Sequence, residues 1–582
     1  RALAPSDVVH EIYRRISATL NNPIWIYLVP EEQAAAAANA LPESPNKSLF
    51  GVPFAVKDNI DVANLLTTAA CPAFAYAAPE NAAVVQRLLD DGAILIGKTN
   101  LDQFATGLVG VRSPYGACSN LFNPEYISGG SSSGSALAVA SGLVSFALGT
   151  DTAGSGRVPA AFANIVGLKP TKGVLSTKGV VPACRSLDCV SIFSLTVGDA
   201  EIVFDIAAGY DAQDCYSRRY RPQEAPLKKC RIGIPADPQL DQVEGGYRAL
   251  FTEAISRFRS LGHSIVTIDA RSFLETANLL YGGPWVAERF AAVGVFIKDH
   301  PDSIHPVVCD IVLGGEKFTA TDAFNAQYRL EQLRQETSIA WESMDVLLLP
   351  TAPNIYRIEE IEREPIFLNS RLGVFTNFTN LLDLAGIAVP AGFRADGLPF
   401  GVTLLRPAFG EAELFALGQS YLESLHPMLG ATRVPCPVAD PEGSATAAPD
   451  GIMIAVVGAH LTGEPLNHQL TDLDARFIQR TKTAPLYRMF ALPASAPAKP
   501  GLVRVGPESG SSVELEVWEL PVREFGKFVK NIPTPLTIGT IHLESGQQVK
   551  GFLCEEVATN GATDITRFGG WKAYCESLDL VR

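Results

Sequence analysis

The sequence predicts an α/β protein with a large domain followed by a smaller α+β domain. With 582 residues the chain is too long for one typical domain, and 47% hydrophobic residues supply more than one core. Residues 230–234, 247–261 and 263–268 have the patterns of a strand, a helix and a strand, which together form a βαβ-like unit of a mixed sheet. Residues 435–451 are rich in Pro, Ala, Gly and Ser, as linkers are, and segments typical of strands follow.

These observations set the expected domain boundaries. We expect a first domain over residues 1–434, a linker over 435–451 and a second domain over 452–582. The second domain begins with the apolar strand pattern of residues 452–458. Three further β-branched and aromatic segments support its α+β class, at residues 513–520, 540–543 and 551–557.

Composition and charge exclude several classes of protein. The formal net charge of −15 argues against nonspecific binding to nucleic acid or to an anionic membrane. The apolar run at residues 136–149 is shorter than the roughly 20 residues that span a bilayer. We find no signal peptide pattern and expect a cytoplasmic protein. The ten cysteines contain no CxxC pair, so we expect buried reduced thiols, no metal and no cofactor.

The first elements along the chain are scaffold. Apolar residues recur at every fourth position within residues 7–20, which predicts an amphipathic helix. Residues 23–29 have the pattern of a strand, and the alanine-rich residues 31–41 that of a helix.

A lysine follows the short apolar strand pattern within residues 51–60. Lysines at such positions are ordinarily ion-paired or reach solvent. Burial, however, lowers the pKa of a lysine, so that Lys57 could serve as a base. Lys98 and Lys169 also follow apolar segments and compete for that role.

Two turns dense in Gly and Ser, residues 129–134 and 150–156, are separated by an uncharged run of small residues. The second turn presents consecutive backbone N–H groups at Ala153, Gly154 and Ser155, as an oxyanion hole or anion nest requires. Such segments are also common as plain turns or linkers. Neither ends in the Gly-Lys-Ser/Thr of a phosphate-binding P-loop.

Three motifs in this region resemble, in order, those of the amidase signature family. They are residues 129–134, the Gly-Thr-Asp-Thr-Ala-Gly-Ser of 149–155 and the Gly-Leu-Lys-Pro-Thr of 167–171. The resemblance extends over about residues 5–430 and implies a central mixed β-sheet surrounded by helices. Two departures are Ser133 in place of a usual Gly, and the Ala-Gly-Ser-Gly-Arg of 153–157 in place of Gly-Gly-Ser-Ile-Arg.

The resemblance also implies a catalytic triad. Lys57 would be the base, Ser131 the bridging serine and Ser155 the nucleophile that attacks an amide carbonyl. A serine hydroxyl is a weak nucleophile until a positioned base takes its proton, and here the proton would pass through Ser131 to Lys57. The expected oxyanion donors belong to the turn that contains Thr152, Ala153 and Gly154.

A second segment narrows the resemblance to the allophanate hydrolase branch of the family. The Gly-Gly-Pro within residues 280–289 predicts a break between two helices. In that branch a tyrosine and an arginine hold the carboxylate of a small anionic ureido acid, and Tyr281 and Arg289 match them. A solvent-exposed or ion-paired arginine is the alternative. Residues 102–116 resemble the family's substrate loop, in which Gly107 is a candidate contact and a plain turn is the alternative. Residues 186–188 are similar to a family Ser-x-Asp segment that supports the active-site loop.

The second domain has a resemblance of its own. Residues 458–467 are similar to the C-terminal domain of allophanate hydrolases, which is itself similar to γ-glutamyl cyclotransferase folds. There a strand-to-helix turn forms a small anion pocket, and a histidine that matches His460 is implicated in decarboxylating N-carboxycarbamate. An ordinary loop histidine is equally compatible with the sequence. Residues 564–571 also match, with Arg567 as a candidate anion contact.

The function implied is hydrolysis of allophanate to ammonia and N-carboxycarbamate, which decays to ammonia and CO2. A biotin-dependent urea carboxylase would supply the substrate, and a homodimer is expected from the family. The same activity closes either urea or s-triazine breakdown. The alternatives are a broad-specificity amidase, a glutamine-hydrolysing amidotransferase subunit, and a catalytically silent binding protein on the same scaffold.

Overall fold

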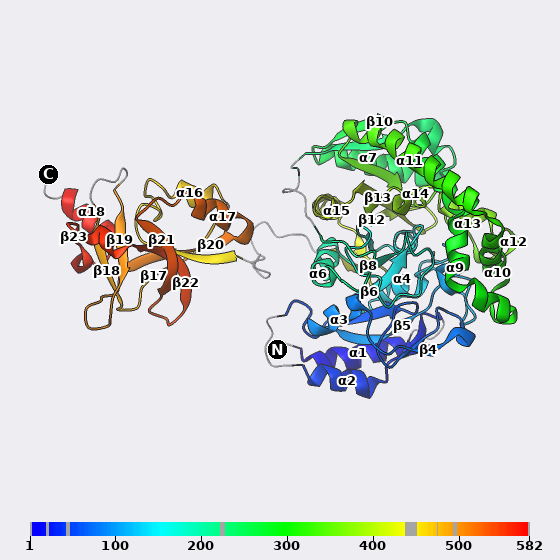
Figure 1. Cartoon of the computed structure of the whole chain (residues 1–582), viewed down its shortest axis with the longest axis horizontal. Coiled ribbons are helices and arrows are strands. Elements are labelled where there is room, and N and C mark those ends of the chain that lie inside the picture. The colour runs from blue at the N-terminus through cyan, green and yellow to red at the C-terminus, as the bar shows by residue number, and fades with distance from the viewer. Residues whose placement is uncertain are drawn as a thin grey trace. The chain divides into compact units, whose positions relative to one another are not determined.

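The computed structural model describes residues 3–18, 22–41, 47–220, 227, 229–436, 451–473, 475–492 and 498–579. The chain divides into two compact units, Arg1–Val438 and Ala439–Arg582, which we describe separately. Of the expected linker, residues 437–450 lie outside the described part of the chain. Figure 1 labels many of the helices and strands of both units.

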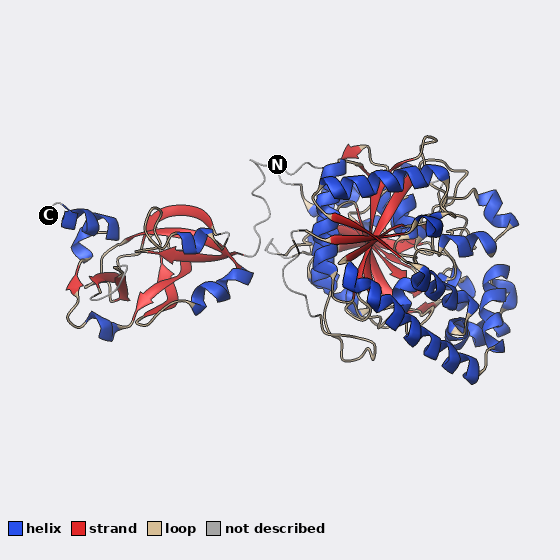
Figure 2. Ribbon diagram, turned by 90° about the horizontal axis from the view of Figure 1, so that it is seen from above, coloured by secondary structure: helices blue, strands red, loops and turns tan. Residues whose placement is uncertain are grey.

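The large unit is built on one mixed sheet of eleven strands, and Figure 2 shows these strands at its centre with the helices around them. Across the sheet the order is β1 (Trp25–Leu28), β5 (Ile94–Thr99), β2 (Pro53–Lys57), β6 (Phe146–Asp151), β8 (Cys189–Ser194), β7 (Val166–Lys169), β12 (Leu384–Phe393), β13 (Pro399–Pro407), β11 (Val346–Pro350), β9 (Arg231–Pro235) and β10 (Ser264–Ile268). β2 runs parallel to both β5 and β6, whereas β6 is antiparallel to β8. The expected mixed sheet is confirmed.

Helices cover both faces of this sheet, because its central strands are apolar on both sides. Neighbouring residues of β2 and β6 point to opposite faces, so that Phe54 and Leu148 join one apolar cluster while Ala55 and Ala147 join another. The longer helices are α1 (Pro5–Ala18), α2 (Glu31–Asn39), α3 (Ala83–Asp90), α4 (Ser133–Ala140), α6 (Val197–Ala207), α7 (Gly245–Ser260), α8 (Arg271–Gly282), α9 (Trp285–Asp299), α10 (Pro306–Leu313), α11 (Ala320–Ser343) and α15 (Glu411–Leu425). Four shorter ones are α5 (Val158–Phe162), α12 (Ile358–Arg363), α13 (Phe367–Leu372) and α14 (Phe378–Leu381).

The elements expected from periodicity are present. The βαβ-like unit is β9, α7 and β10, and its two strands pair in parallel from Ser264 with Arg231 to Ile268 with Pro235. The Gly-Gly-Pro segment separates α8 from α9 as expected, and Arg289 is the fifth residue of α9. Among the described residues no helix is long and apolar enough to cross a membrane, and no cluster of three His, Cys, Asp or Glu side chains is arranged to hold a metal.

The small unit contains two sheets around one apolar core. Its five-stranded sheet has the order β17 (Arg476–Lys482), β20 (Glu514–Pro521), β16 (Gly451–Val456), β22 (Gln548–Cys554) and β21 (Leu536–His542), and its three-stranded sheet is β19 (Pro500–Arg504), β18 (Tyr487–Ala491) and β23 (Thr563–Asp564). The helices are α16 (His468–Thr471), α17 (Val522–Lys530) and α18 (Trp571–Asp579). The strand expected over residues 551–557 is displaced: it ends at Cys554, and Glu556–Thr559 form a 3-10 turn.

Candidate active site

The centre of the site is a buried lysine at the end of β2. Val56 pairs with Leu148 of β6, and this register brings Lys57 and Thr150 to the same edge of the sheet. Lys57 Nζ donates to Ser131 Oγ and to Thr150 Oγ1, each at 2.8 Å. Burial lowers the pKa of Lys57 to about 7, even though three nearby carboxylates favour its charged form. The neutral amine is therefore well populated near neutral pH.

The first Gly/Ser turn positions Ser131 two residues before the first residue of α4, Ser133. Ser132 links it to the second turn, since Ser132 Oγ donates to the carbonyl of Thr150 at 3.1 Å and accepts from its N–H at 3.3 Å. The carbonyl of Ser131 accepts from the N–H of Asp102 at 3.0 Å. These bonds hold the bridging serine of the predicted triad, which has no exposed surface, between two strand ends.

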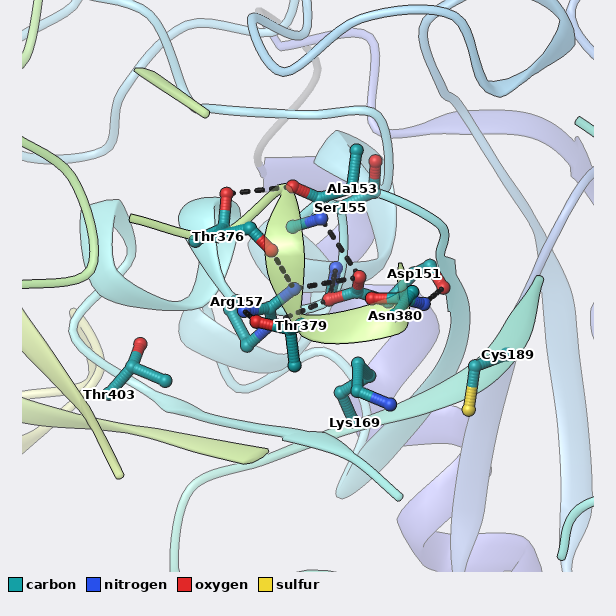
Figure 3. A network of polar contacts seen from close by, with 12 residues as sticks. Asp151, Ala153, Ser155, Arg157, Lys169, Cys189, Thr376, Thr379, Asn380 and Thr403 are labelled. Atoms are coloured by element: carbon teal, nitrogen blue, oxygen red, sulfur yellow. Dashed lines mark hydrogen bonds and ion pairs between the residues drawn. The ribbon is translucent and has the colours of Figure 1, made fainter. Parts of the chain in front are cut away.

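An ion pair shapes the second turn, between β6 and α5. The buried Asp151 carboxylate accepts from Arg157 Nε at 2.9 Å and from the N–H groups of Gly154 and Gly156 at 2.8 and 3.0 Å (Figure 3). Burial alone would raise the pKa of Asp151, but the charge of Arg157 and these donors outweigh it and hold the pKa below its ordinary value. The backbone of the turn thus surrounds the Asp151 carboxylate.

The hydrogen bonds to Asp151 determine which N–H groups of the turn remain available to a substrate. The N–H of Gly154, an expected oxyanion donor, is already committed to Asp151. Among the described residues, the backbone N–H groups of Thr152, Ala153 and Ser155 have no hydrogen-bond acceptor. A row of unused donors beside a serine hydroxyl can stabilise a developing oxyanion. Ser155 Oγ itself donates to the carbonyl of Gly107 at a long 3.5 Å, which places Gly107 beside the expected nucleophile.

Two residues expected to bind a carboxylate lie together at the start of α9 and the end of α8. Arg289 is 2% exposed, and its Nη2 donates to the Tyr281 hydroxyl at 3.2 Å. Arg289 Nη1 donates to Thr106 Oγ1 at 2.9 Å, on the loop that leads to Gly107. Among the described residues no carboxylate forms an ion pair with Arg289. A buried guanidinium without a counter-ion is costly, and an anionic ligand would compensate it.

The small unit has a cavity of about 230 Å³ around His460. His460 Nε2 lies 3.0 Å from Gln469 Oε1, and its ring stacks on Phe552 with centroids 5.0 Å apart. Burial lowers the pKa of His460, which favours its neutral imidazole. Arg567 is not among the residues that line this cavity: it is exposed, and its guanidinium lies over the ring of Phe568.

Comparison with known proteins places this geometry in a family. The model of the family described as amidase matches residues 7–415. The chain belongs to the amidase family. A second family model, that of the allophanate hydrolase C-terminal domain, matches residues 452–576 of this amidase.

We compare the chain with three similar proteins. The chain is 46% identical over 575 residues to the urea amidolyase of Saccharomyces cerevisiae, covering 95% of this chain and 31% of that protein. A solved structure of Kluyveromyces lactis allophanate hydrolase is 43% identical with a TM-score of 0.73, covering 99% of this chain and 97% of that one. A glutamyl-tRNA(Gln) amidotransferase subunit from Legionella pneumophila is 34% identical over 421 residues, covering 67% of this chain and 87% of that protein. The amidase thus spans under a third of the length of the curated urea amidolyase that it matches.

The competing lysines of this amidase have other partners. Lys98 Nζ lies 3.0 Å from Asp58 Oδ1 in a fully buried ion pair, and Lys169 Nζ donates to the carbonyl of Pro170 at 2.8 Å. Neither bonds to Ser131 or Ser155 among the described contacts, whereas Lys57 does bond to Ser131. The geometry therefore favours Lys57 as the base.

Sequence reasoning missed two contributors to the site. Thr150 accepts from Lys57 of the neighbouring strand β2, and Arg157 anchors Asp151 within the same turn. Asp188, in the segment that the family resemblance assigns to support of the active-site loop, accepts from Thr152 Oγ1 at 2.5 Å. The sequence signal that could have identified Thr150 is its position between Gly149 and Asp151 in the second family motif.

Proposed function

We propose that this amidase hydrolyses allophanate, releasing ammonia and N-carboxycarbamate. The observation that carries the proposal is the buried Arg289 guanidinium, which has no carboxylate partner among the described residues. A substrate carboxylate would complete its charge, with the Tyr281 hydroxyl beside it. The relatives named urea amidolyase and allophanate hydrolase support this choice.

The proposed chemistry begins with neutral Lys57. It takes the proton of Ser131, and Ser131 takes that of Ser155, whose oxygen attacks the terminal carbonyl of the substrate. This transfer needs the Ser155 hydroxyl to turn from Gly107 toward Ser131, and such bonds commonly tighten only when substrate binds. The oxyanion that forms would be stabilised by the N–H groups of Thr152, Ala153 and Ser155.

The reverse relay completes the cycle. The proton held by Lys57 returns through Ser131 to the leaving nitrogen, so that ammonia departs and an acyl-enzyme remains on Ser155. A water molecule, deprotonated through the same two groups, then hydrolyses the ester and frees the dianionic product. Each step uses the same hydrogen-bonded pair, Lys57 and Ser131.

We also propose that the small unit assists the decay of this product through His460. The cavity around His460 and the match to the allophanate hydrolase C-terminal domain support the idea. Removal of His460 by His460→Ala should leave the first ammonia release unchanged and delay CO2, when both are followed in one reaction. Arg567→Gln is the control, since Arg567 does not line the cavity. Unchanged CO2 release in His460→Ala would remove the decarboxylation proposal.

The proposed physiological context follows from the relatives. We expect a biotin-dependent urea carboxylase to supply allophanate, since the matched relatives named urea amidolyase are about three times as long as this chain. A cytoplasmic homodimer is the expected form.

The decisive experiment compares ammonia release from allophanate, malonamide and glutamine. In the wild type, allophanate should be preferred. Arg289→Ala should lower kcat/KM for allophanate by about 100-fold or more, because loss of one partner of a buried charge pair costs about 2–5 kcal/mol. Lys298→Gln, which removes an exposed charge from the same helix, should change nothing. Equal use of malonamide or glutamine with a harmless Arg289→Ala would instead indicate a broad amidase or an amidotransferase component.

A further inference from the structure

The large unit contains a second cavity, of about 670 Å³, that the proposed reaction does not use. Lys57, Ser131, Ser155 and Arg289 are not among its lining residues. Its size falls within the range of about 300–1,000 Å³ that is typical of small-molecule sites. It therefore has room for a ligand distinct from the substrate.

Basic side chains from separate segments converge on this cavity. Lys172 follows β7, Arg185 precedes β8, Arg218 lies in the loop before β9, and Arg334 extends from α11. Arg218 is neutralised by Asp383, whose two carboxylate oxygens lie 2.9 and 2.8 Å from its Nη1. The three other cations face the cavity in a chain with a net charge of −15, so the local charge opposes that of the whole molecule.

These three cations are not satisfied by carboxylates of the cavity wall. Lys172 Nζ donates to the carbonyl of Ser186 at 3.4 Å, and no ion pair of Lys172 or Arg185 is found among the described residues. Arg334 pairs with Glu331 one turn earlier on α11, and Glu331 does not line the cavity. Burial, together with the neighbouring cations Lys169 and Arg334, lowers the pKa of Lys172 to about 8.

Part of the remaining wall is apolar and aromatic, alongside polar residues that include Asp188, Ser186 and Asp383. Trp341, Leu382, Leu384 and Pro407 line it, with Tyr216 alongside. A basic cluster beside an aromatic wall fits a ligand that has both an anionic group and an apolar body.

We propose that this cavity binds a small organic anion, a phosphate or carboxylate attached to an aromatic or apolar body, at a site separate from the catalytic centre. Two contacts couple the site to the catalytic centre. Asp188 forms part of the cavity wall and accepts from Thr152 of the oxyanion turn at 2.5 Å. Ser186 Oγ, on the same wall, donates at 2.6 Å to Glu288, the neighbour of Arg289. An occupant would therefore alter kcat without competing with substrate.

Calorimetric titration of the full chain with AMP, phthalate and inorganic phosphate tests the proposal. AMP or phthalate should bind with a Kd below about 1 mM, and inorganic phosphate more weakly, because it lacks the apolar body. If AMP binds more tightly than phthalate, the site prefers a phosphate, and if phthalate binds more tightly, it prefers a carboxylate. Lys172→Gln and Arg185→Gln should each weaken binding by about tenfold; Arg185 is exposed, so its variant is expected to fold even if Lys172→Gln does not.

Two controls separate this site from the active site. Arg289→Ala and the exposed Arg259→Gln should bind the probe within about twofold of wild type, and a saturating probe should change kcat for allophanate with KM held within about twofold. The proposal is overturned if neither organic probe binds, if binding survives Lys172→Gln and Arg185→Gln, or if Arg289→Ala abolishes it. Purely competitive inhibition would also overturn it. Because the binding measurement needs no turnover, its outcome is independent of the proposed function.

Discussion

The pH dependence of acylation tests the role of Lys57 most directly. The side chain has no exposed surface, and burial lowers its pKa from 10.5 to about 7. At pH 7 about half of the molecules then hold a neutral amine, against about one in 3,000 for an ordinary lysine. The difference corresponds to about 5 kcal/mol in favour of the form that can accept a proton.

The neutral form of Lys57 is the one that can act as the base. Because only neutral Lys57 can take the proton of Ser131, kcat/KM should rise with pH, from about one-tenth of its plateau at pH 6 to the plateau above pH 8. The assay is ammonia release from allophanate and from neutral malonamide between pH 5.5 and 9. Using both substrates separates the enzyme's titration from any effect on the substrate carboxylate.

Two variants sharpen this test. Lys57→Met should reduce kcat by about 10²- to 10⁴-fold, the usual contribution of a general base. Arg289 is a positive neighbour that lowers the pKa of Lys57, so Arg289→Ala should move the midpoint for malonamide to higher pH. A rate that is flat from pH 6 to 9, or a midpoint near 10, would refute the assignment of Lys57 as the base.

Three further predictions concern the groups around the triad. Thr150→Val removes an acceptor of Lys57 at 2.8 Å and should lower kcat about tenfold with little change in KM, as steady-state kinetics would show; an unchanged kcat would mean that Thr150 does not position the lysine. Asp151→Asn leaves the buried Arg157 without its counter-ion and should cost about 3–5 kcal/mol of unfolding free energy in urea titrations, whereas Asp237→Asn, at an exposed ion pair, should cost little. Gly154 has φ +130° and an added Cβ would lie 2.7 Å from Thr376 Cβ, so Gly154→Ala should lower kcat by about 100-fold through displacement of the turn; wild-type kcat would contradict this.

Much of this molecule is determined by local patterns in the sequence. The helix over Pro5–Ala18, the parallel strands β9 and β10, and the break before α9 follow from periodicity and from Gly and Pro. These features depend on residues close together in the chain, and the family motifs added the expected identity of the triad. The strand expected at residues 551–557 was displaced, because its apolar pattern does not mark where pairing with β21 begins and ends.

Only the tertiary structure decided how the site is assembled. Its contacts favour Lys57 over Lys98 and Lys169 as the proposed base. The N–H of Gly154 donates to Asp151, and Arg567 lies outside the cavity of His460. The tertiary structure also buried Arg289 without an ion pair to any carboxylate among the described residues. The physical reason is that the pKa of a side chain, and whether a donor or a charge has a partner, depend on burial and on neighbours from distant segments of the chain. The sheet register that brings those segments together is a property of the whole fold.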